Sequence, residues 1–128
     1  MIRANGVKKA FGEKVVLHGI DAEFQSGQVN FIIGRSGSGK SVLTKCMVGL
    51  LEVDSGRVQY GDSVFSELNR RDREAVRREI GMLFQGGALF DSMTVLENVE
   101  FPLRMFSDMA EDERKERAME CLRRVELL

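Results

Sequence analysis

Residues Gly34 to Ser41 have the spacing of a polyphosphate-binding loop, and no other stretch of the sequence is as well suited to chemistry. Their order, Gly-Arg-Ser-Gly-Ser-Gly-Lys-Ser, fits the pattern G-x-x-x-x-G-K-[ST]. The glycines let backbone N–H groups approach phosphate oxygens closely. Lys40 adds a positive charge, and the Ser41 hydroxyl can reach a magnesium ion on the terminal phosphates. The motif therefore predicts nucleotide binding.

A match to this motif is trusted only when a buried strand precedes it and a helix follows, and the flanking residues predict both. Residues 29–33 are almost continuously apolar, which is typical of a parallel strand covered on both faces. After the loop, apolar residues recur at helical spacing, namely Val42, Leu43, Cys46, Met47 and Leu50. A glycine-rich turn that matches by chance is the alternative, but strand, loop and helix agree on the nucleotide-binding interpretation.

Two residues outside the loop are further candidates. Residues 80–84 predict another buried strand, which ends at Gln85. Because ligands of open parallel sheets bind beyond the carboxyl ends of the strands, Gln85 could face the phosphates or the metal. Phe11 lies between Ala10 and Gly12, so its ring could be accessible and stack on a purine base. An ordinary loop glutamine and a core aromatic are the alternatives, and spacing alone favours the latter for Phe11.

The rest of the chain predicts an α/β fold with a P-loop core of parallel strands and helices. An N-terminal antiparallel β layer is expected over about 1–28 and 57–66, as short strands joined by tight turns such as Asn5-Gly6. The core is expected over about 29–52 and 80–85, and a helical subdomain begins at about 86–128. Together they form part of one domain, 1–128.

Three charged or apolar helices are predicted in the second half of the chain. Residues 69–79 predict a solvated helix rather than a nucleic-acid patch, because acids alternate with the arginines. A helix is predicted over Thr94–Phe106, with Thr94 or Ser92 as its N-cap and Glu97 in position for a capping box with Thr94. Pro102 is expected to kink or break it. Its apolar residues exceed one core-facing stripe, which indicates a partner or an uncovered core. Residues 110–128 predict a charged helix.

Composition excludes several classes of function. The 128 residues carry a formal net charge of -1, so no basic field attracts nucleic acid. Neither a membrane-spanning run nor a signal peptide is found, and we expect a cytosolic protein. Cys46 and Cys121 are expected to be structural thiols, and His18 receives no function.

The loop, Gln85 and the segment Thr94-Val95-Leu96-Glu97-Asn98-Val99 together resemble the ATP-binding subunits of ABC transporters, over nearly the whole chain. The resemblance implies ATP and Mg²⁺ as cofactors, with Lys40 and Gln85 as catalytic residues and Ser41 and Gln85 as metal ligands. It also places Phe11 where the family stacks an aromatic on adenine, with Val16 beside it. The implied nucleotide-binding residues are Phe11, Val16, Gly34, Ser36, Gly37, Ser38, Gly39, Lys40, Ser41 and Val42.

Two stretches resemble a narrower group, the ATPases of bacterial Mla-type or Mce-associated lipid transport systems. They are Gly-Lys-Ser-Val-Leu around Lys40 and Gly-Met-Leu-Phe-Gln-Gly-Gly-Ala-Leu-Phe-Asp-Ser-Met-Thr-Val around Gln85. Val42 is a discriminator, because most transporter ATPases have threonine there. The resemblance implies lipid transport, a membrane permease bound through Gly86 to Phe106, a second nucleotide-binding subunit, and a place on the cytoplasmic face of the inner membrane.

Three motifs of the family do not occur among these residues: the L-S-G-G-Q signature, an apolar strand ending in Asp-Glu, and a switch histidine. We therefore expect an N-terminal portion, truncated before the signature, that binds Mg-ATP but does not hydrolyse it alone. The alternatives are a binding module that holds nucleotide or a membrane partner without turnover, and an ABC importer or exporter of another substrate. A kinase or GTPase is disfavoured because no N-K-x-D motif is present.

Overall fold

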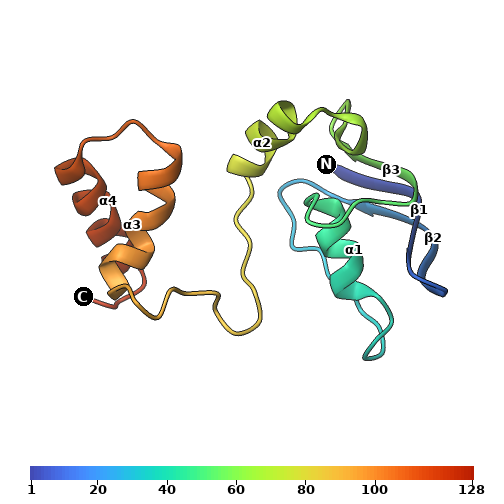
Figure 1. The fold of residues 1–128 in the computed structure, drawn as a ribbon, viewed down its shortest axis with the longest axis horizontal. Helices are drawn as coiled ribbons and strands as arrows, with labels where there is room; N and C mark the ends of the chain where they lie inside the picture. The colour runs from blue at the N-terminus through green and yellow to red at the C-terminus, as the bar shows by residue number, and fades with distance from the viewer. The chain divides into compact units, whose positions relative to one another are not determined.

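A computed structural model describes residues 1–128, which form two compact units, Met1–Ile80 and Gly81–Leu128 (Figure 1). The elements of the first unit are β1 (Ile2–Phe11), β2 (Lys14–Phe24), α1 (Lys40–Met47), β3 (Ser55–Tyr60), β4 (Ser63–Val64), the 3₁₀ helix η1 (Phe65–Glu67) and α2 (Arg70–Arg78). The second unit contains α3 (Val95–Phe106) and α4 (Glu111–Arg124). None of the helices combines the length and apolar character that crossing a membrane requires.

The first unit is built on one antiparallel sheet with the strand order β2-β1-β3-β4. The predicted antiparallel layer is therefore present, but its strands are longer than expected. Asn5-Gly6, predicted as a tight turn, lies inside β1, where the register against β2 shifts between Ala4 and Val7. The Gly6 N–H donates to the Asp21 carboxylate at 2.7 Å, so the irregularity is paired and the strand continues.

Helix α1 packs against this sheet through its predicted apolar stripe. Leu43, Cys46 and Met47 are buried, and the other members of the core cluster are Ala4, Val7, Leu17, Val58 and Phe65. The Tyr60 hydroxyl donates to the Met47 carbonyl at 2.9 Å, which ties β3 to the end of α1. Burial raises the pKa of the Cys46 thiol, as expected of a structural rather than a reactive cysteine.

The predicted parallel strands of the core are not formed. Neither residues 29–33 nor residues 80–84 adopt strand structure, and Val29, Ile33 and Leu83 are 81%, 91% and 91% exposed. The physical reason is that a parallel strand obtains its hydrogen bonds from neighbouring strands, and no segment pairs with either run. The α/β class is retained through the antiparallel sheet and its helices.

Helix α2 is the charged, solvated helix that the sequence predicts. Its N-cap is Asn69, whose side chain accepts from the Asp72 N–H at 3.0 Å, and no residue of the helix is buried. Arg70 pairs with Glu74 on the surface at 3.4 Å. Arg73 anchors the helix, because its guanidinium donates to the Ser66 carbonyl at 2.6 Å.

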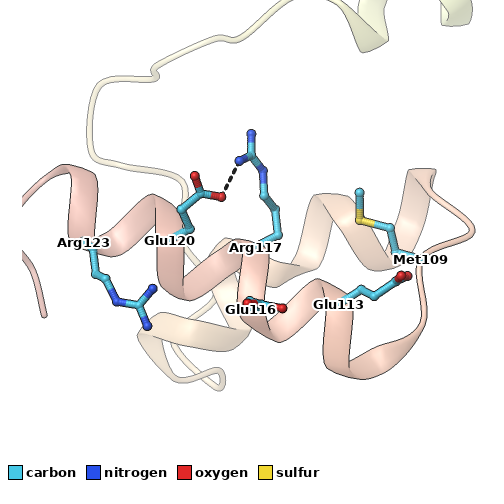
Figure 2. Close-up of a pocket in the computed structure, with 6 residues that line it drawn as sticks. All are labelled: Met109, Glu113, Glu116, Arg117, Glu120 and Arg123. Atoms are coloured by element: carbon cyan, nitrogen blue, oxygen red, sulfur yellow. Dashed lines mark hydrogen bonds and ion pairs between the residues drawn. The ribbon is translucent and has the colours of Figure 1, made fainter.

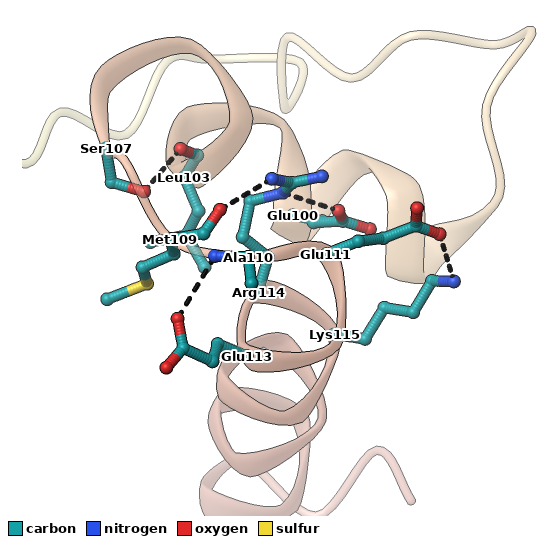
Figure 3. A network of polar contacts seen from close by, with 9 residues as sticks. All are labelled: Glu100, Leu103, Ser107, Met109, Ala110, Glu111, Glu113, Arg114 and Lys115. Carbon is teal, nitrogen blue, oxygen red and sulfur yellow. Dashed lines mark hydrogen bonds and ion pairs between the residues drawn. The ribbon is translucent and has the colours of Figure 1, made fainter.

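The second unit is a helix pair held by polar contacts (Figure 3). Thr94 caps α3 with the predicted capping box, and α3 continues through Pro102 to Phe106, so the proline does not break it. Between the helices, Arg114 Nε donates to Glu100 Oε1 at 3.0 Å and Arg114 Nη1 to the Met109 carbonyl at 2.7 Å. The Glu113 carboxylate accepts from the Ala110 N–H and starts α4.

Candidate functional site

The loop from Gly34 to Ser41 leads directly into α1. Its turn is closed by the Ser38 N–H, which donates to the Arg35 carbonyl at 3.2 Å. Gly39, in the left-handed conformation with φ 95°, is the N-cap of α1 and provides no side-chain cap. The first N–H groups of α1 therefore lack a side-chain partner, and with the helix dipole they can bind an anion.

Gly39 also fixes the loop against the sheet. A Cβ atom at this position would lie 2.9 Å from Leu17 Cδ2 and 3.1 Å from Val16 Cγ1, closer than such atoms normally approach. A side chain at this position would force the side chains of Leu17 and Val16 to shift, in addition to the strain of the positive φ. Glycine is thus required here to bring the loop to the end of the β1–β2 hairpin.

Lys40 lies over the loop that precedes it. Its Nζ donates to the Gly34 carbonyl at 2.9 Å and to the Arg35 carbonyl at 2.8 Å. An ammonium group has three donors, so one N–H is left for a ligand. The charge is therefore held close to the backbone N–H groups that would contact the phosphates.

A hollow of 340 Å³ lies between the loop and the hairpin. It is lined by Phe11, Lys14, Val16, Gly37, Gly39, Lys40, Ser41 and Val42. Seven of these eight are predicted site residues, and the structure brings them together. Phe11 is 47% exposed, so its ring is accessible to a ligand in the hollow. Gly34, Ser36 and Ser38 belong to the same loop but are not among the lining residues.

Lys14 is a lining residue that the sequence analysis did not find. It is the partner of Phe11 in the last register pair of the hairpin, which places it at the mouth of the turn around Gly12. Its charge adds to that of Lys40 on the side of the hollow formed by the hairpin. The available signal was the hairpin register, because a residue paired with Phe11 must share its surroundings.

Gln85 belongs to the second unit, in a turn where the Gly87 N–H donates to the Phe84 carbonyl at 3.1 Å. Its side chain is exposed. The two glycines that follow have φ 89° and 82°, a conformation that glycine adopts without steric cost, and the freedom of this loop to move stays a prediction. A role of Gln85 at the phosphates or the metal stays a prediction.

Magnesium fits the first unit through Ser41. The structure contains no group of three or more His, Cys, Asp or Glu residues that could hold a metal ion. Mg²⁺ commonly takes one or two protein ligands together with phosphate oxygens and water. Ser41 is exposed on the hollow and offers one hydroxyl oxygen, so the ion would depend on the nucleotide for most of its coordination.

A second hollow, of 520 Å³, lies along α4 (Figure 2). It is lined by Met109, Glu113, Glu116, Arg117, Glu120 and Arg123, and Arg117 donates to the Glu120 carboxylate at 2.6 Å. Three carboxylates would repel a polyphosphate, and one of the two arginines is already paired. The hollow at the loop is therefore the candidate site.

Apolar side chains are exposed in the region Gly86 to Phe106, for which a partner is predicted. The exposed apolar side chains are those of Leu89, Phe90, Val95, Met105 and Phe106. Within the region, the rings of Phe90 and Phe101 are centred 4.7 Å apart, and Asn98 hydrogen-bonds the backbone of Phe90. Exposed apolar residues are the kind of residue that a protein partner would cover, and the partner of this region stays a prediction.

Comparison with known proteins gives consistent results. Residues 17–128 match the protein family described as "ABC transporter". The chain is 39% identical over 127 residues to the methionine import ATP-binding protein MetN of Rhizobium johnstonii, covering 99% of this chain and 35% of that protein. It is 37% identical to the probable amino-acid import ATP-binding protein YxeO of Bacillus subtilis, covering 99% of this chain and 52% of that protein.

Solved structures that align with this chain also include ABC transporter cassettes. The dimeric structure of the bacterial ABC transporter cassette MJ0796 aligns with a TM-score of 0.85 and 33% identity, covering 96% of this chain and 56% of that one. The same cassette bound to ADP and Pi aligns with a TM-score of 0.83 at 32% identity, over 96% and 56% of the two chains. The chain thus spans about half the length or less of the relatives named here.

Proposed function

The chain belongs to the ABC transporter family, and from this we propose that it is the part of an ATP-binding subunit that holds Mg-ATP in the hollow between the loop and the β1–β2 hairpin. The observation that carries the proposal is the convergence of Phe11, Val16 and the P-loop on one hollow. Phosphates would bind the loop N–H groups and Lys40, and the base would stack on Phe11.

Each part of the hollow has a distinct task in this proposal. Lys40 stabilises the negative charge of the phosphates, and Ser41 orients the bound ion. Bound magnesium supplies charge neutralisation of the phosphate oxygens. Val16 and Val42 provide the apolar lining, while Phe11 fixes the base. The chain thus binds and orients the nucleotide, and Gln85 is proposed as a further contact to the ion and the attacking water.

Hydrolysis is proposed for the whole protein but not for these residues alone. The apolar strand ending in Asp-Glu, which the family resemblance links to the catalytic base, does not occur among them. Positioning alone does not complete phosphoanhydride cleavage. We expect the 128-residue chain to release phosphate from Mg-ATP no faster than a Lys40→Ala control. A phosphate-release assay measures this. Turnover clearly above the control would show that the catalytic machinery lies within these residues.

The proposed partners are a membrane permease, bound through Gly86 to Phe106, and a second nucleotide-binding subunit. Exposed apolar residues in that region support the first, and the dimeric MJ0796 cassettes support the second. The protein would then lie on the cytoplasmic face of the inner membrane. Without turnover, the same surface and site would make a nucleotide-dependent binding module, which is the alternative.

We propose lipids, and phospholipids in particular, as the transported substrates. The support is the resemblance of the stretches around Lys40 and Gln85 to the Mla-type and Mce-associated ATPases, including Val42 after the loop serine. The names of the relatives, which specify methionine and amino-acid import, support a different importer instead.

The substrate proposal is tested on the membrane complex captured through a tag on this protein. Mass spectrometry of the small molecules that co-purify with it is expected to find phospholipid enriched over a mock capture from the same membranes. Enrichment of methionine or another amino acid, without phospholipid, would contradict lipid transport and leave the ATP-binding proposal intact.

A further inference from the structure

Asp54 controls the end of β1 that leads into Phe11. The register of β1 against β3 ends with the pair Lys8 and Ser55. Beyond this pair, Asp54 provides the hydrogen bonds to β1. Its N–H donates to the Lys8 carbonyl at 2.9 Å, and its Oδ2 accepts from the Ala10 N–H at 2.6 Å. These hydrogen bonds to Asp54 thus fix the β1 backbone as far as Ala10, the residue before Phe11.

The same carboxylate holds a cation beside the ring. Lys9 Nζ donates to Asp54 Oδ1 at 2.8 Å and lies 5.7 Å from the centroid of the Phe11 ring. The Lys9 side chain is only 14% exposed, so the ammonium is confined between carboxylate and ring. The hydrogen bonds from Lys9 and Ala10 lower the pKa of the Asp54 carboxyl, which keeps it ionised and able to hold both donors.

We propose that Asp54 is a positioning residue that, through Lys9 and the backbone of Ala10, orients Phe11 for the adenine base of ATP. Asp54 does not line the hollow itself, so its effect on the ligand passes through Phe11. The inference rests on the proposed function, since it takes the hollow to be the ATP site. It assigns Asp54 to recognition of the base and leaves the phosphates to the loop.

The experiment compares two ligands on the full chain by calorimetric titration with magnesium: ATP, and inorganic tripolyphosphate, which lacks the base. Stacking of a base on an aromatic ring is worth on the order of a tenfold change in affinity. We therefore expect Asp54→Ala to lower the affinity for ATP about five- to tenfold. Tripolyphosphate affinity should change by less than about twofold. Phe11→Ala should give the same pattern, and adding Asp54→Ala to it should have little further effect.

Asp21→Ala is the matched control. Asp21 also accepts from a β1 backbone N–H, that of Gly6, but it lies away from Phe11 and the hollow. Its substitution should leave the ratio of ATP to tripolyphosphate affinity unchanged. Asp54→Asn, which keeps an oxygen acceptor for Ala10, provides a milder variant if the alanine chain folds poorly, and it should shift the ratio in the same direction.

The outcomes separate this inference from the proposed function. If Phe11→Ala lowers ATP affinity and neither Asp54 variant shifts the ratio, the positioning role is wrong and the ATP site stands. Equal weakening of both ligands by Asp54→Ala would likewise overturn it, because that result describes general destabilisation. If Phe11→Ala leaves ATP affinity unchanged, the proposed site fails and the inference fails with it.

Discussion

Lys40→Ala is expected to abolish measurable Mg-ATP binding while the fold stays intact. The substitution removes the ammonium that lies over the loop and the N–H left for a phosphate. Hydrogen bonds to charged groups contribute about 1.5–3 kcal/mol each, so losing this one contact weakens binding by roughly ten- to a hundredfold. Losing the positive charge beside the phosphates weakens binding further. A calorimetric titration of the full chain measures the loss.

Lys45→Ala is the control for this experiment. Lys45 is an exposed lysine on the same helix, in the last turn of α1, and it does not line the hollow. Its substitution should leave ATP affinity nearly unchanged. Thermal unfolding of both variants confirms that they fold. Unchanged affinity in Lys40→Ala would show that the loop is not the phosphate site.

Gly56→Ala is expected to destabilise the first unit more than any other glycine-to-alanine change in its sheet. A Cβ at Gly56 would lie 2.4 Å from the Gly6 carbonyl oxygen and 2.6 Å from that of Asn5, and the residue has φ 87°. Both atoms belong to the backbone of β1, so they cannot move without opening the β1–β3 ladder. The left-handed conformation costs about 1–2 kcal/mol and the overpacking about 1–3 kcal/mol more, so we expect a loss of about 3 kcal/mol.

Gly61→Ala separates the two causes. Gly61 also has a positive φ, of 58°, but a Cβ there would have nothing within 4 Å. The Gly61→Ala substitution should therefore lower the free energy of unfolding only by the conformational cost, about 1 kcal/mol. A urea titration measures this loss. Equal losses at both positions would mean that backbone strain, and not the contact with β1, accounts for the effect at Gly56.

The parts of the fold that could be predicted from sequence are those with local causes. Helix α3 follows from a capping box between Thr94 and Glu97, which needs no other part of the chain, and α2 lies within the predicted range 69–79. The β1–β2 and β3–β4 pairs follow because consecutive strands pair through short connections, whereas the β1–β3 pair joins strands that β2, the loop and α1 separate. Asn5-Gly6 was predicted as a turn because Asn-Gly is a strong turn signal. In the structure it is an irregularity inside β1, where the Gly6 N–H donates to Asp21.

The strands predicted at 29–33 and 80–84 are not formed, because they depend on pairing with distant segments rather than on local causes. Their apolar runs signal burial, but a parallel strand exists only with neighbours that sequence periodicity does not provide. Here these runs are unpaired and most of their residues are exposed, although Ile32 packs against the core. Local composition thus predicts that a segment prefers to be buried, and tertiary pairing decides whether it becomes a strand.

Some residues of the candidate site could likewise be predicted from local sequence, and others depend on contacts between distant residues. The loop could be predicted from eight consecutive residues, because its chemistry is contained in one motif. Spacing alone did not favour Phe11, and family resemblance was needed to place it and Val16 beside the loop. Lys14 and Asp54 were missed, since their importance comes from the hairpin register and from contacts between residues 9 and 54. Such contacts leave no periodic signal.

The central claim is that the hollow between the P-loop and the β1–β2 hairpin is the Mg-ATP site. Proton–nitrogen correlation spectra of the isotopically labelled chain, recorded during titration with Mg-ATP, test it most directly. We predict that the amide signals of Gly37, Gly39, Lys40 and Ser41 shift together with that of Phe11. Shifts confined to the α4 hollow around Glu113 to Arg123, or spectra that do not change, would contradict the claim.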